Sequence, residues 1–476
     1  MVDSVSIPAV RPGEMAYEVP PPDPAVVARL VEAVRARLTV EVQAEQSGTG
    51  SPVEAARRDE ITETLLAEEL EALASAELAA GRPMPTAQTE AAWAKAARDH
   101  LFGLGGLQRY LDLPDVENIN VHAFDKVFLR LTGNRRERGA WPVAASDAEL
   151  TELIRTIAAR SEENEKRFDR SEPIVDVQLP DGSRMNAIGW VSERPMLSIR
   201  VHRHPTASMA TMISLGVVDE DLAAFLSAAV KARMNILIAG GPGTGKTTML
   251  RALASQIGPE EDLITIEDNR ELNLGADERA HPAVRALQSR PGNIEGEGEI
   301  TLAALTRAAL RGAPDRVIVG EVRGAEVVEM FKAMSQGSDG SMGTIHASES
   351  EDVFARLALY AGEGPGGLSL SEANRFVATA VDLIVQLDYL EDGSTRVVSS
   401  IREVTGADGE ELVTNQVFAP DVSGPAKATG AITDKRARRL ERAGLDPRVL
   451  VAASTSSLLY SALEPAGFSD TPPGRW

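Results

Sequence analysis

The residue types best suited to chemistry lie together in one glycine-rich segment. It reads Gly240-Gly241-Pro242-Gly243-Thr244-Gly245-Lys246-Thr247 and is followed by Thr248. Glycines let backbone N–H groups converge on phosphate oxygens, and a helix that begins here adds positive potential. The Lys246 ammonium can reach the β- and γ-phosphates, and the Thr247 hydroxyl can ligate Mg²⁺. The segment therefore predicts a site for a nucleoside triphosphate, with ATP and Mg²⁺ as the expected ligands.

A carboxylate at the end of a second strand completes such a site. Glu321 follows the apolar run 316–319, which we expect to form a buried strand. There it could orient or activate the attacking water, or bind Mg²⁺ directly or through the water shell of the ion. Gly320 stands where an Asp is more usual, so Glu321 is the acid that this strand presents. The alternative is an ordinary glutamate that caps the next helix.

Two more expected strands end in polar groups. The run 263–266 is followed by Glu267, Asp268 and Glu271, which could lie beside the γ-phosphate because the carboxyl ends of parallel strands face the ligand crevice. The sequence does not rank Glu267 and Glu271 as catalytic groups. His346 ends the run 342–345 and could sense a phosphate through its charge state. A structural role is the alternative for this histidine.

The elements around these residues alternate between strand and helix. The apolar run 234–239 leads into the glycine-rich segment, and alternation of this kind predicts a largely parallel sheet covered on both faces. We expect helices at 219–233, 247–257, 301–311, 325–336 and 349–360, the last starting with a capping-box spacing at Ser348, and antiparallel strands at 382–390, 396–404 and 412–418.

The first 205 residues have a different pattern. Residues 1–24 are rich in proline and predict a mobile leader, and helical spacing follows at 25–45 and 53–80. The Glu-rich face of the second helix is interpreted as a solvated face rather than a docking surface. We then expect an α+β arrangement with paired strands at 118–121 and 126–131 and a helix at 150–159. A strand at 174–179, a turn at 180–182 and two more strands follow, the last of them at 197–201.

Composition narrows the classes of function. The 476 residues include 49 Lys and Arg against 71 Asp and Glu, a net charge of −22, which argues against a protein that wraps duplex nucleic acid or adsorbs to anionic lipid. The absence of cysteine excludes disulfides and thiol catalysis. No signal peptide is visible, and Asp382 interrupts the longest apolar stretch, Phe376 to Leu387. We therefore expect no direct insertion into a membrane.

In this order, the four strand ends resemble those of the type II/IV secretion ATPases. The resemblance covers roughly residues 95–420, and within the family it is strongest to the tight-adherence (Flp) pilus assembly branch, on the segments Pro314–Gly324 and Pro173–Asn186. One departure is Ser338, which stands where that branch usually has a histidine.

The resemblance implies an α/β fold in which a RecA-like P-loop NTPase domain follows a smaller α+β domain and a helical, partly disordered extension. The implied segments are 1–90 for the extension, 91–205 for the α+β domain, 206–420 for the ATPase domain and 421–476 for a tail with a short helix. It also implies that arginines of the α+β domain contact the phosphates, and the candidates by position are Arg184, Arg200 and Arg203, with Arg323 from the ATPase domain.

The function implied is that of an ATP-hydrolysing motor. By resemblance it forms a homo-hexamer in the cytoplasm, at the inner face of the cytoplasmic membrane, and drives an inner-membrane platform protein in pilus assembly or protein secretion. A conjugation or type IV secretion ATPase that acts on DNA or protein stays open as an alternative. So does a nucleotide-gated scaffold without significant hydrolysis, whereas the acidic charge and the 4% aromatic content argue against a nucleic-acid motor.

Overall fold

The computed structural model describes residues 23–49, 53–81, 85–160, 166–202, 207–290, 292, 297–363 and 366–451. The predicted leader falls almost wholly outside these residues, as do Arg203 and the last 25 residues of the tail. The chain divides into two compact units, the first ending at Arg203 and the second beginning at His204. None of the helices in the described part of the chain is both long and apolar enough to span a bilayer.

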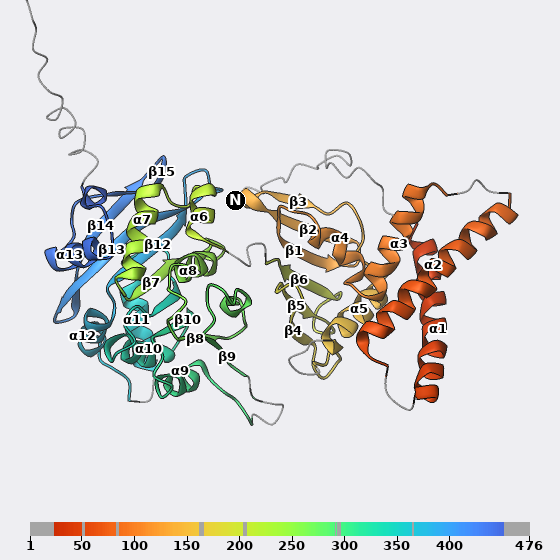
Figure 1. Ribbon diagram of the computed structural model, residues 1–476, viewed down its shortest axis with the longest axis horizontal. Coiled ribbons are helices and arrows are strands. Elements are labelled where there is room, and N and C mark those ends of the chain that lie inside the picture. The colour runs from red at the N-terminus through yellow and green to blue at the C-terminus, as the bar shows by residue number, and fades with distance from the viewer. Residues whose placement is uncertain are drawn as a thin grey trace, which may run out of the picture. The chain divides into compact units, whose positions relative to one another are not determined.

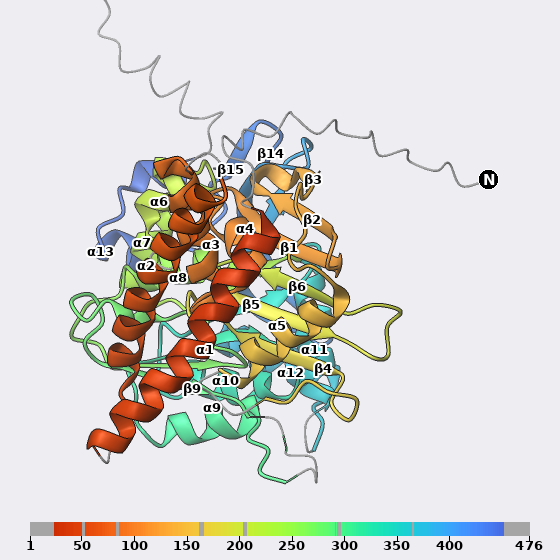
Figure 2. The same cartoon turned by 90° about the vertical axis from the view of Figure 1, so that its right-hand side faces the viewer.

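The first unit begins with a group of three helices, shown in red and orange in Figure 2. They are α1 (Pro24–Thr49), α2 (Ala55–Ala79) and α3 (Ala87–Leu101). Val27, Leu30 and Val34 recur at helical spacing on α1, and they share an apolar core with Leu66 of α2 and Leu101 of α3. The predicted helices at 25–45 and 53–80 are confirmed, whereas α3 was not predicted.

An antiparallel sheet forms the rest of the first unit. Among the described residues its strands follow the order β3-β2-β1-β6-β5-β4. Except in the short edge strand β3, the apolar side chains of the strands alternate toward a core shared with α5, and the polar ones face the other way. The strands are β1 (Val116–Ala123), β2 (Lys126–Leu131), β3 (Arg136–Arg138), β4 (Ile174–Gln178), β5 (Arg184–Ile188) and β6 (Met196–Arg200), and the helices are η1 (Gly105–Leu107), α4 (Gln108–Leu111), η2 (Thr132–Asn134) and α5 (Asp147–Ala159).

The second unit contains a mixed sheet, seen in Figure 1 with its helices. In the described residues its order is β15-β14-β13-β12-β7-β11-β10-β8-β9, and β12-β7-β11-β10-β8-β9 run parallel. The strands are β7 (Ile236–Gly240), β8 (Leu263–Glu267), β9 (Val284–Gln288), β10 (Arg316–Val322), β11 (Met342–His346), β12 (Leu383–Tyr389), β13 (Arg396–Asp408), β14 (Glu411–Asp421) and β15 (Gly424–Ala428). The predicted α/β fold with a parallel sheet is confirmed.

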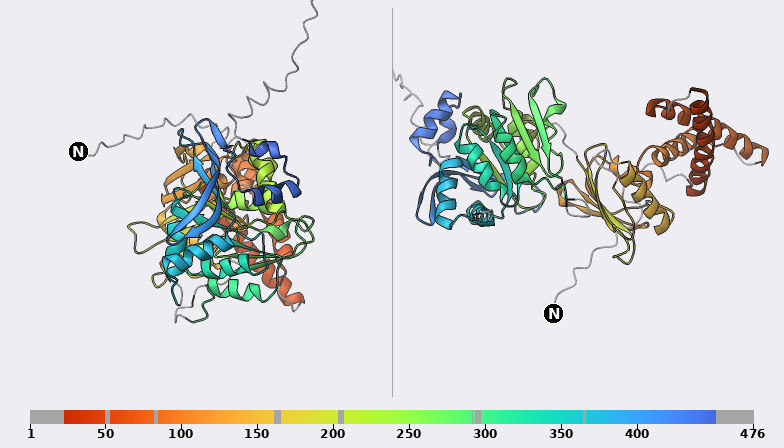
Figure 3. Two further views of the ribbon diagram at one scale, coloured as in Figure 1. Left: turned by 90° about the vertical axis from the view of Figure 1, so that its left-hand side faces the viewer. Right: turned by 90° about the horizontal axis from the view of Figure 1, so that it is seen from below.

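Helices cover both faces of this sheet, as Figure 3 also shows. Alternate residues of β7 enter two separate cores, since Ile236 and Ile238 pack with α6, α7, α8 and α13, and Leu237 and Ala239 pack with α9 to α12. The helices are α6 (Met209–Ser214), α7 (Glu220–Lys231), α8 (Lys246–Ala254), η3 (Leu274–Ala276), α9 (Leu302–Leu310), α10 (Glu326–Ser335), α11 (Asp352–Glu363), α12 (Leu370–Ala380), α13 (Asp434–Arg442) and η4 (Pro447–Leu450).

The predicted start of α11 at Ser348 is wrong, because the helix begins at Asp352. Gln386 on β12 donates from Nε2 to the carbonyl oxygen of Ser348 at 3.0 Å. Glu351 pairs with Arg402 of β13 rather than reaching back to a capping position. Contacts with the neighbouring strands therefore hold this segment out of the helix.

The buried carboxylate of Glu403 connects the first turn of α13 to the sheet. Glu403 of β13 is fully buried and accepts hydrogen bonds from Asn415 Nδ2, from Thr433 N and Oγ1, and from Arg436 Nη1. Arg436 also contacts Asp382 Oδ1 at 2.8 Å. Burial alone would raise the pKa of Glu403, but these hydrogen bonds outweigh it and hold the pKa below its ordinary value.

We expect Glu403→Ala to lower the free energy of unfolding of the second unit by about 3–5 kcal/mol, because it leaves the Arg436 guanidinium buried with half of its partners. Urea unfolding of the full chain measures this, with the exposed Glu391→Ala as the matched control. Since the folded pKa is depressed, the contribution of Glu403 is complete above its unfolded pKa and is lost as the pH falls through the folded pKa. Equal stabilities of the two variants would contradict this role.

Candidate active site

The four strands that carry the candidate residues are neighbours, in the order β7-β11-β10-β8. Their carboxyl ends present Gly240, His346, Glu321 and Glu267 at one edge of the sheet, and Gly240 is in direct register with His346. The glycine-rich loop follows β7 and passes into the first turn of α8. Gly245 has φ +97°, a conformation that side chains disfavour, so the loop needs glycine at this position.

Lys246 contacts its own loop and the neighbouring strand. Its Nζ lies 3.0 Å from Gly240 O, 2.9 Å from Gly241 O and 3.1 Å from His346 Nδ1. An ammonium group only donates, so His346 Nδ1 must accept, and the imidazole is neutral with its proton on Nε2. This nitrogen lies 2.8 Å from Glu321 Oε1, to which it donates.

The polar contacts continue from Glu321 to β8. Arg323 donates from Nη2 to Glu321 Oε2 at 2.5 Å and from Nη1 to Asp268 Oδ2 at 3.1 Å. Asp268 Oδ1 in turn accepts from Ser289 Oγ at 2.8 Å. The hydrogen bond to Glu321 raises the pKa of Arg323 above its ordinary value, despite the opposing effect of burial. Lys246, His346, Glu321, Arg323 and Asp268 thus form one connected chain, named the strand-end network below.

Glu267 and Glu271 take a different part in the structure. The Glu267 carboxylate is buried and accepts from the backbone nitrogens of Glu271 and Leu272, at 2.9 and 3.0 Å. It therefore fixes the turn after β8. A Cβ at Gly320 would lie 2.9 Å from Glu267 Cγ, which explains why glycine precedes Glu321. The carbonyl of Glu271 accepts from Arg251 Nε at 3.1 Å.

The remaining loop residues lie around α8. Thr244 is buried and donates from Oγ1 to Gly241 O at 2.9 Å, Pro242 is exposed, and Thr247 and Thr248 are half-buried in the first turn of the helix. Among the described residues no group of three His, Asp or Glu side chains is arranged as a metal site. The Thr247 hydroxyl and the Glu321 carboxylate nevertheless fit Mg²⁺ that is held together with a nucleotide, because this ion keeps several waters and takes few protein ligands.

Sequence reasoning missed two residues at the loop. Tyr389 OH donates to Gly243 O at 2.9 Å, and Arg396 Nε donates to the same carbonyl at 2.8 Å. The Arg396 guanidinium also lies 5.5 Å from the centre of the Tyr389 ring. Both residues come from the hairpin of β12 and β13, about 150 residues along the chain from Gly243, so no local pattern could have indicated them.

Arg184 and Arg200 belong to the first unit, where the sheet brings them together. They are direct cross-strand neighbours on β5 and β6, on the polar face. The same row continues across all six strands of the sheet. Its members in order are Arg136, Arg130, Asn118, Arg200, Arg184 and Gln178. The sequence did not single out Arg130 and Arg136.

The region that holds this site matches a known family. The family model described as type II/IV secretion system protein matches residues 116–387. A protein of Mycobacterium tuberculosis whose name assigns it to conjugal transfer is 32% identical over 323 residues, covering 66% of this chain and 88% of the relative. The type IV secretion system protein PtlH of Bordetella pertussis is 36% identical over 167 residues, which are 34% of this chain and 48% of the relative.

A solved structure is also similar, that of the VirB11 ATPase from the Brucella suis type IV secretion system in complex with sulphate. It is 26% identical, with a TM-score of 0.34, over 64% of this chain and 95% of that one. An α/β unit whose parallel strand leads into a glycine-rich loop with Lys246 and Thr247, beside a strand-end carboxylate, is of the P-loop NTPase type. The match over residues 116–387 shows that the chain belongs to the type II/IV secretion system protein family.

Proposed function

We propose that this protein hydrolyses ATP with Mg²⁺ and works as a motor of a secretion system. The strand-end network carries the proposal, because it links the phosphate-loop lysine to a carboxylate across neighbouring strands, within the region matched by the family model. The loop N–H groups and Lys246 would bind the phosphates, and Thr247 with Glu321 would hold Mg²⁺. Bound Mg²⁺ would add positive charge that stabilises the transferring phosphoryl group.

Binding of ATP would rearrange the strand-end network. Lys246 exchanges Gly240 O, Gly241 O and His346 Nδ1 for phosphate oxygens, and this releases the imidazole. His346 contacts both Lys246 and Glu321, so a change at the lysine reaches the carboxylate through this histidine. Arg323 also contacts Glu321. Glu321 then orients or deprotonates the attacking water. Glu267 is less suited to this step, because its carboxylate already accepts two backbone hydrogen bonds.

Contact of Arg184 and Arg200 with the phosphates stays a prediction. A planar guanidinium can stabilise the charge of phosphoryl transfer through two hydrogen bonds, and the row on the first sheet offers Arg184 and Arg200 side by side. The four predicted segments, 1–90, 91–205, 206–420 and 421–476, stay predictions. The sheet of the second unit extends beyond residue 420, since β15 pairs with β14.

The type of machine is a finer proposal. We propose a homo-hexamer in the cytoplasm that acts on an inner-membrane platform protein. The names of the two relatives support a conjugation or type IV secretion system as the setting, whereas the Flp pilus stays a prediction. Cargo of DNA or protein therefore stands beside pilin. A scaffold without hydrolysis is disfavoured by the presence of Lys246, Thr247 and Glu321 together.

The experiment that tests the motor is ATP turnover against protein concentration, read beside the mass of the assembly. We expect the turnover per chain to rise steeply where a ring of six forms, because a motor site is completed by its neighbour. Turnover that stays constant while the mass increases would reject a composite site. No binding of Mg·ATP at millimolar concentration would reject the function itself.

The hairpin contact with the loop gives a separate prediction. We expect Tyr389→Phe to raise the KM for ATP about three- to tenfold with little change in kcat, because one hydrogen bond that orients the Gly243 carbonyl is lost. Steady-state kinetics measure this, with Tyr360→Phe on α11 as the matched control. An unchanged KM would mean that the loop does not need this contact.

A further inference from the structure

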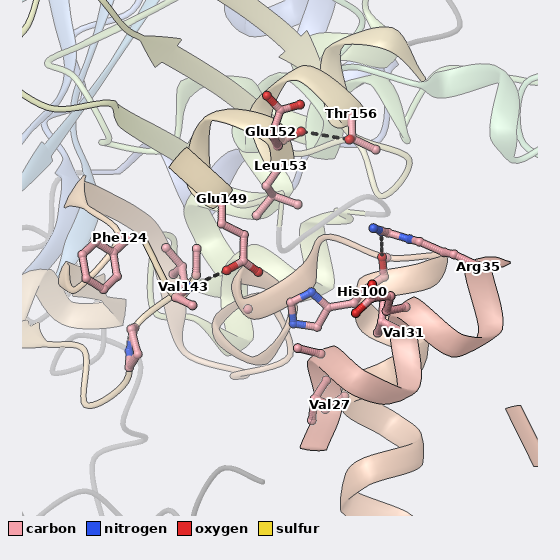
Figure 4. A pocket seen from close by; sticks show the side chains of 18 of the residues that line it. Val27, Val31, Arg35, His100, Phe124, Val143, Glu149, Glu152, Leu153 and Thr156 are labelled. Atoms are coloured by element: carbon pink, nitrogen blue, oxygen red, sulfur yellow. Dashed lines mark hydrogen bonds between the residues drawn. The ribbon is translucent and has the colours of Figure 1, made fainter. Parts of the chain in front are cut away.

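A cavity of about 760 Å³ lies within the first unit, and Figure 4 shows it from close by. Its walls are α1, the end of α3, the segment 141–145 and α5. Small-molecule sites of proteins are typically about 300–1,000 Å³ in volume, so the size is that of a ligand pocket. No residue of the strand-end network lines it.

Most of the wall is apolar. Val27 and Val31 of α1 face Val143 and Leu153 across the cavity, and Phe124 lies at one side (Figure 4). Water in contact with such a wall is displaced favourably by an alkyl or aryl group. The apolar surface would therefore bind the apolar part of a ligand.

The wall is held in place without a ligand. Tyr110 OH donates to Trp141 O at 2.6 Å and accepts from Trp141 N at 2.9 Å. Val143 N donates to Phe124 O at 2.8 Å. The segment 141–145 is thereby fixed between the strand region and α4, as expected of a preformed pocket.

Basic groups gather at the cavity. Arg35, Arg109, Arg160 and His100 all line it. Arg35 Nη2 donates to His100 O at 3.3 Å, Arg160 Nη2 donates to Leu101 O at 3.2 Å, and the Arg109 guanidinium lies 5.1 Å from the centre of the Trp141 ring. Within the described part of the chain, no ion pair links these three guanidiniums to a carboxylate. Each therefore keeps N–H donors to spare, since a guanidinium has five.

Three glutamates also line the cavity, equal in number to its three arginines, but two of them have partners of their own. Glu149 Oε2 accepts from Ala145 N at 2.8 Å, and Glu152 pairs with Arg155. Glu32 is the third lining glutamate. Burial lowers the pKa of His100, Arg109 and Arg160, and Arg35 lowers the pKa of Arg160 further by repulsion. The guanidiniums of Arg35, Arg109 and Arg160, which have no carboxylate partner among the described residues, are therefore the groups that would favour an anionic ligand.

We propose that this cavity binds an organic anion with an apolar body. The alkyl or aryl part lies against Val27, Val31 and Leu153, and a carboxylate or phosphate group accepts hydrogen bonds from Arg35, Arg109 and Arg160. Two sources share this chemistry, a free amphipathic anion and an anionic lipid. The site is separate from the proposed ATP site and does not depend on it.

The test uses the full chain and three probes of equal chain length: decanoate, decanol and decyltrimethylammonium. Isothermal titration calorimetry should show decanoate binding about tenfold or more tightly than decanol, because charge-assisted hydrogen bonds add to the same apolar contact. Arg109→Met and Arg160→Met should each remove most of this difference. Arg29→Met, on an exposed position of α1 outside the cavity, should leave it unchanged.

A second variant tests the cavity itself without removing a charge. Ala36 is exposed on α1 and lines the cavity, so Ala36→Trp should fill it and abolish binding of decanoate while the thermal midpoint is kept. Cosedimentation with phosphatidylglycerol vesicles, lost in the same variants, would identify a lipid, and decanoate binding without cosedimentation would identify a free anion. Equal affinities for decanoate and decanol, or binding unchanged by the Arg→Met and Ala36→Trp variants, would overturn the proposal.

Discussion

Lys246→Ala should abolish ATP turnover and most of the affinity for ATP. The ammonium is the cation of the glycine-rich loop, and it is buried among Gly240 O, Gly241 O and His346 Nδ1. Its removal takes away the charge that faces the β- and γ-phosphates, and charge-assisted hydrogen bonds are the strong ones in such a site. Phosphate release measures the turnover, and binding of a fluorescent ATP analogue measures the affinity.

The matched control for this change is Lys231→Ala at the exposed end of α7, which should keep both values. A lysine variant that retains normal turnover would reject the site. The variant also separates binding from folding, because the Lys246 ammonium bonds to its own loop and to His346, and its loss should change thermal unfolding without nucleotide only a little.

Glu321→Gln should keep the binding of ATP and lose hydrolysis, with kcat lower by about 10²–10⁴-fold. Glutamine preserves the shape of the side chain but cannot accept a proton from water. The amide oxygen can still accept one of the two hydrogen bonds, from His346 Nε2 or from Arg323 Nη2, so the strand-end network is weakened rather than removed. Single-turnover measurements with saturating ATP isolate this step from binding.

Glu349→Gln, an exposed position shortly after β11, serves as the control of the same chemistry. If Glu321→Gln leaves kcat unchanged, the general base is elsewhere, and Glu267 and Glu271 are the remaining candidates on β8 and its turn. A Glu267→Gln variant would then be tested. It should also lower the thermal stability, because the neutral amide weakens the two hydrogen bonds from the backbone nitrogens of Glu271 and Leu272.

The sequence predicted the parts of this molecule that depend on local patterns. Strands β7, β8, β10 and β11 are apolar runs buried on both faces, so their existence and parallel arrangement follow from the sequence alone. Strand β9 was missed because it lies at the edge of the sheet and buries little of its surface, which leaves Val284–Gln288 without a strong pattern.

Contacts between segments that are distant in the sequence could not be predicted, for a different reason. The start of α11 depends on Gln386 and Arg402, which lie on strands that follow it in the chain. The contacts of Tyr389 and Arg396 with Gly243 depend on β12 pairing with β7. In both cases tertiary partners compete with a local preference, and no spacing within the segment encodes them.

The row Arg136, Arg130, Arg200 and Arg184 has an effect at long range. On a molecule with an excess of 22 negative charges, it makes one side of the first sheet an island of positive potential. An anion that approaches this face of the sheet would therefore meet attraction from the arginine row before any contact is made. Added salt shortens the range of this electrostatic attraction to about 8–10 Å near physiological ionic strength.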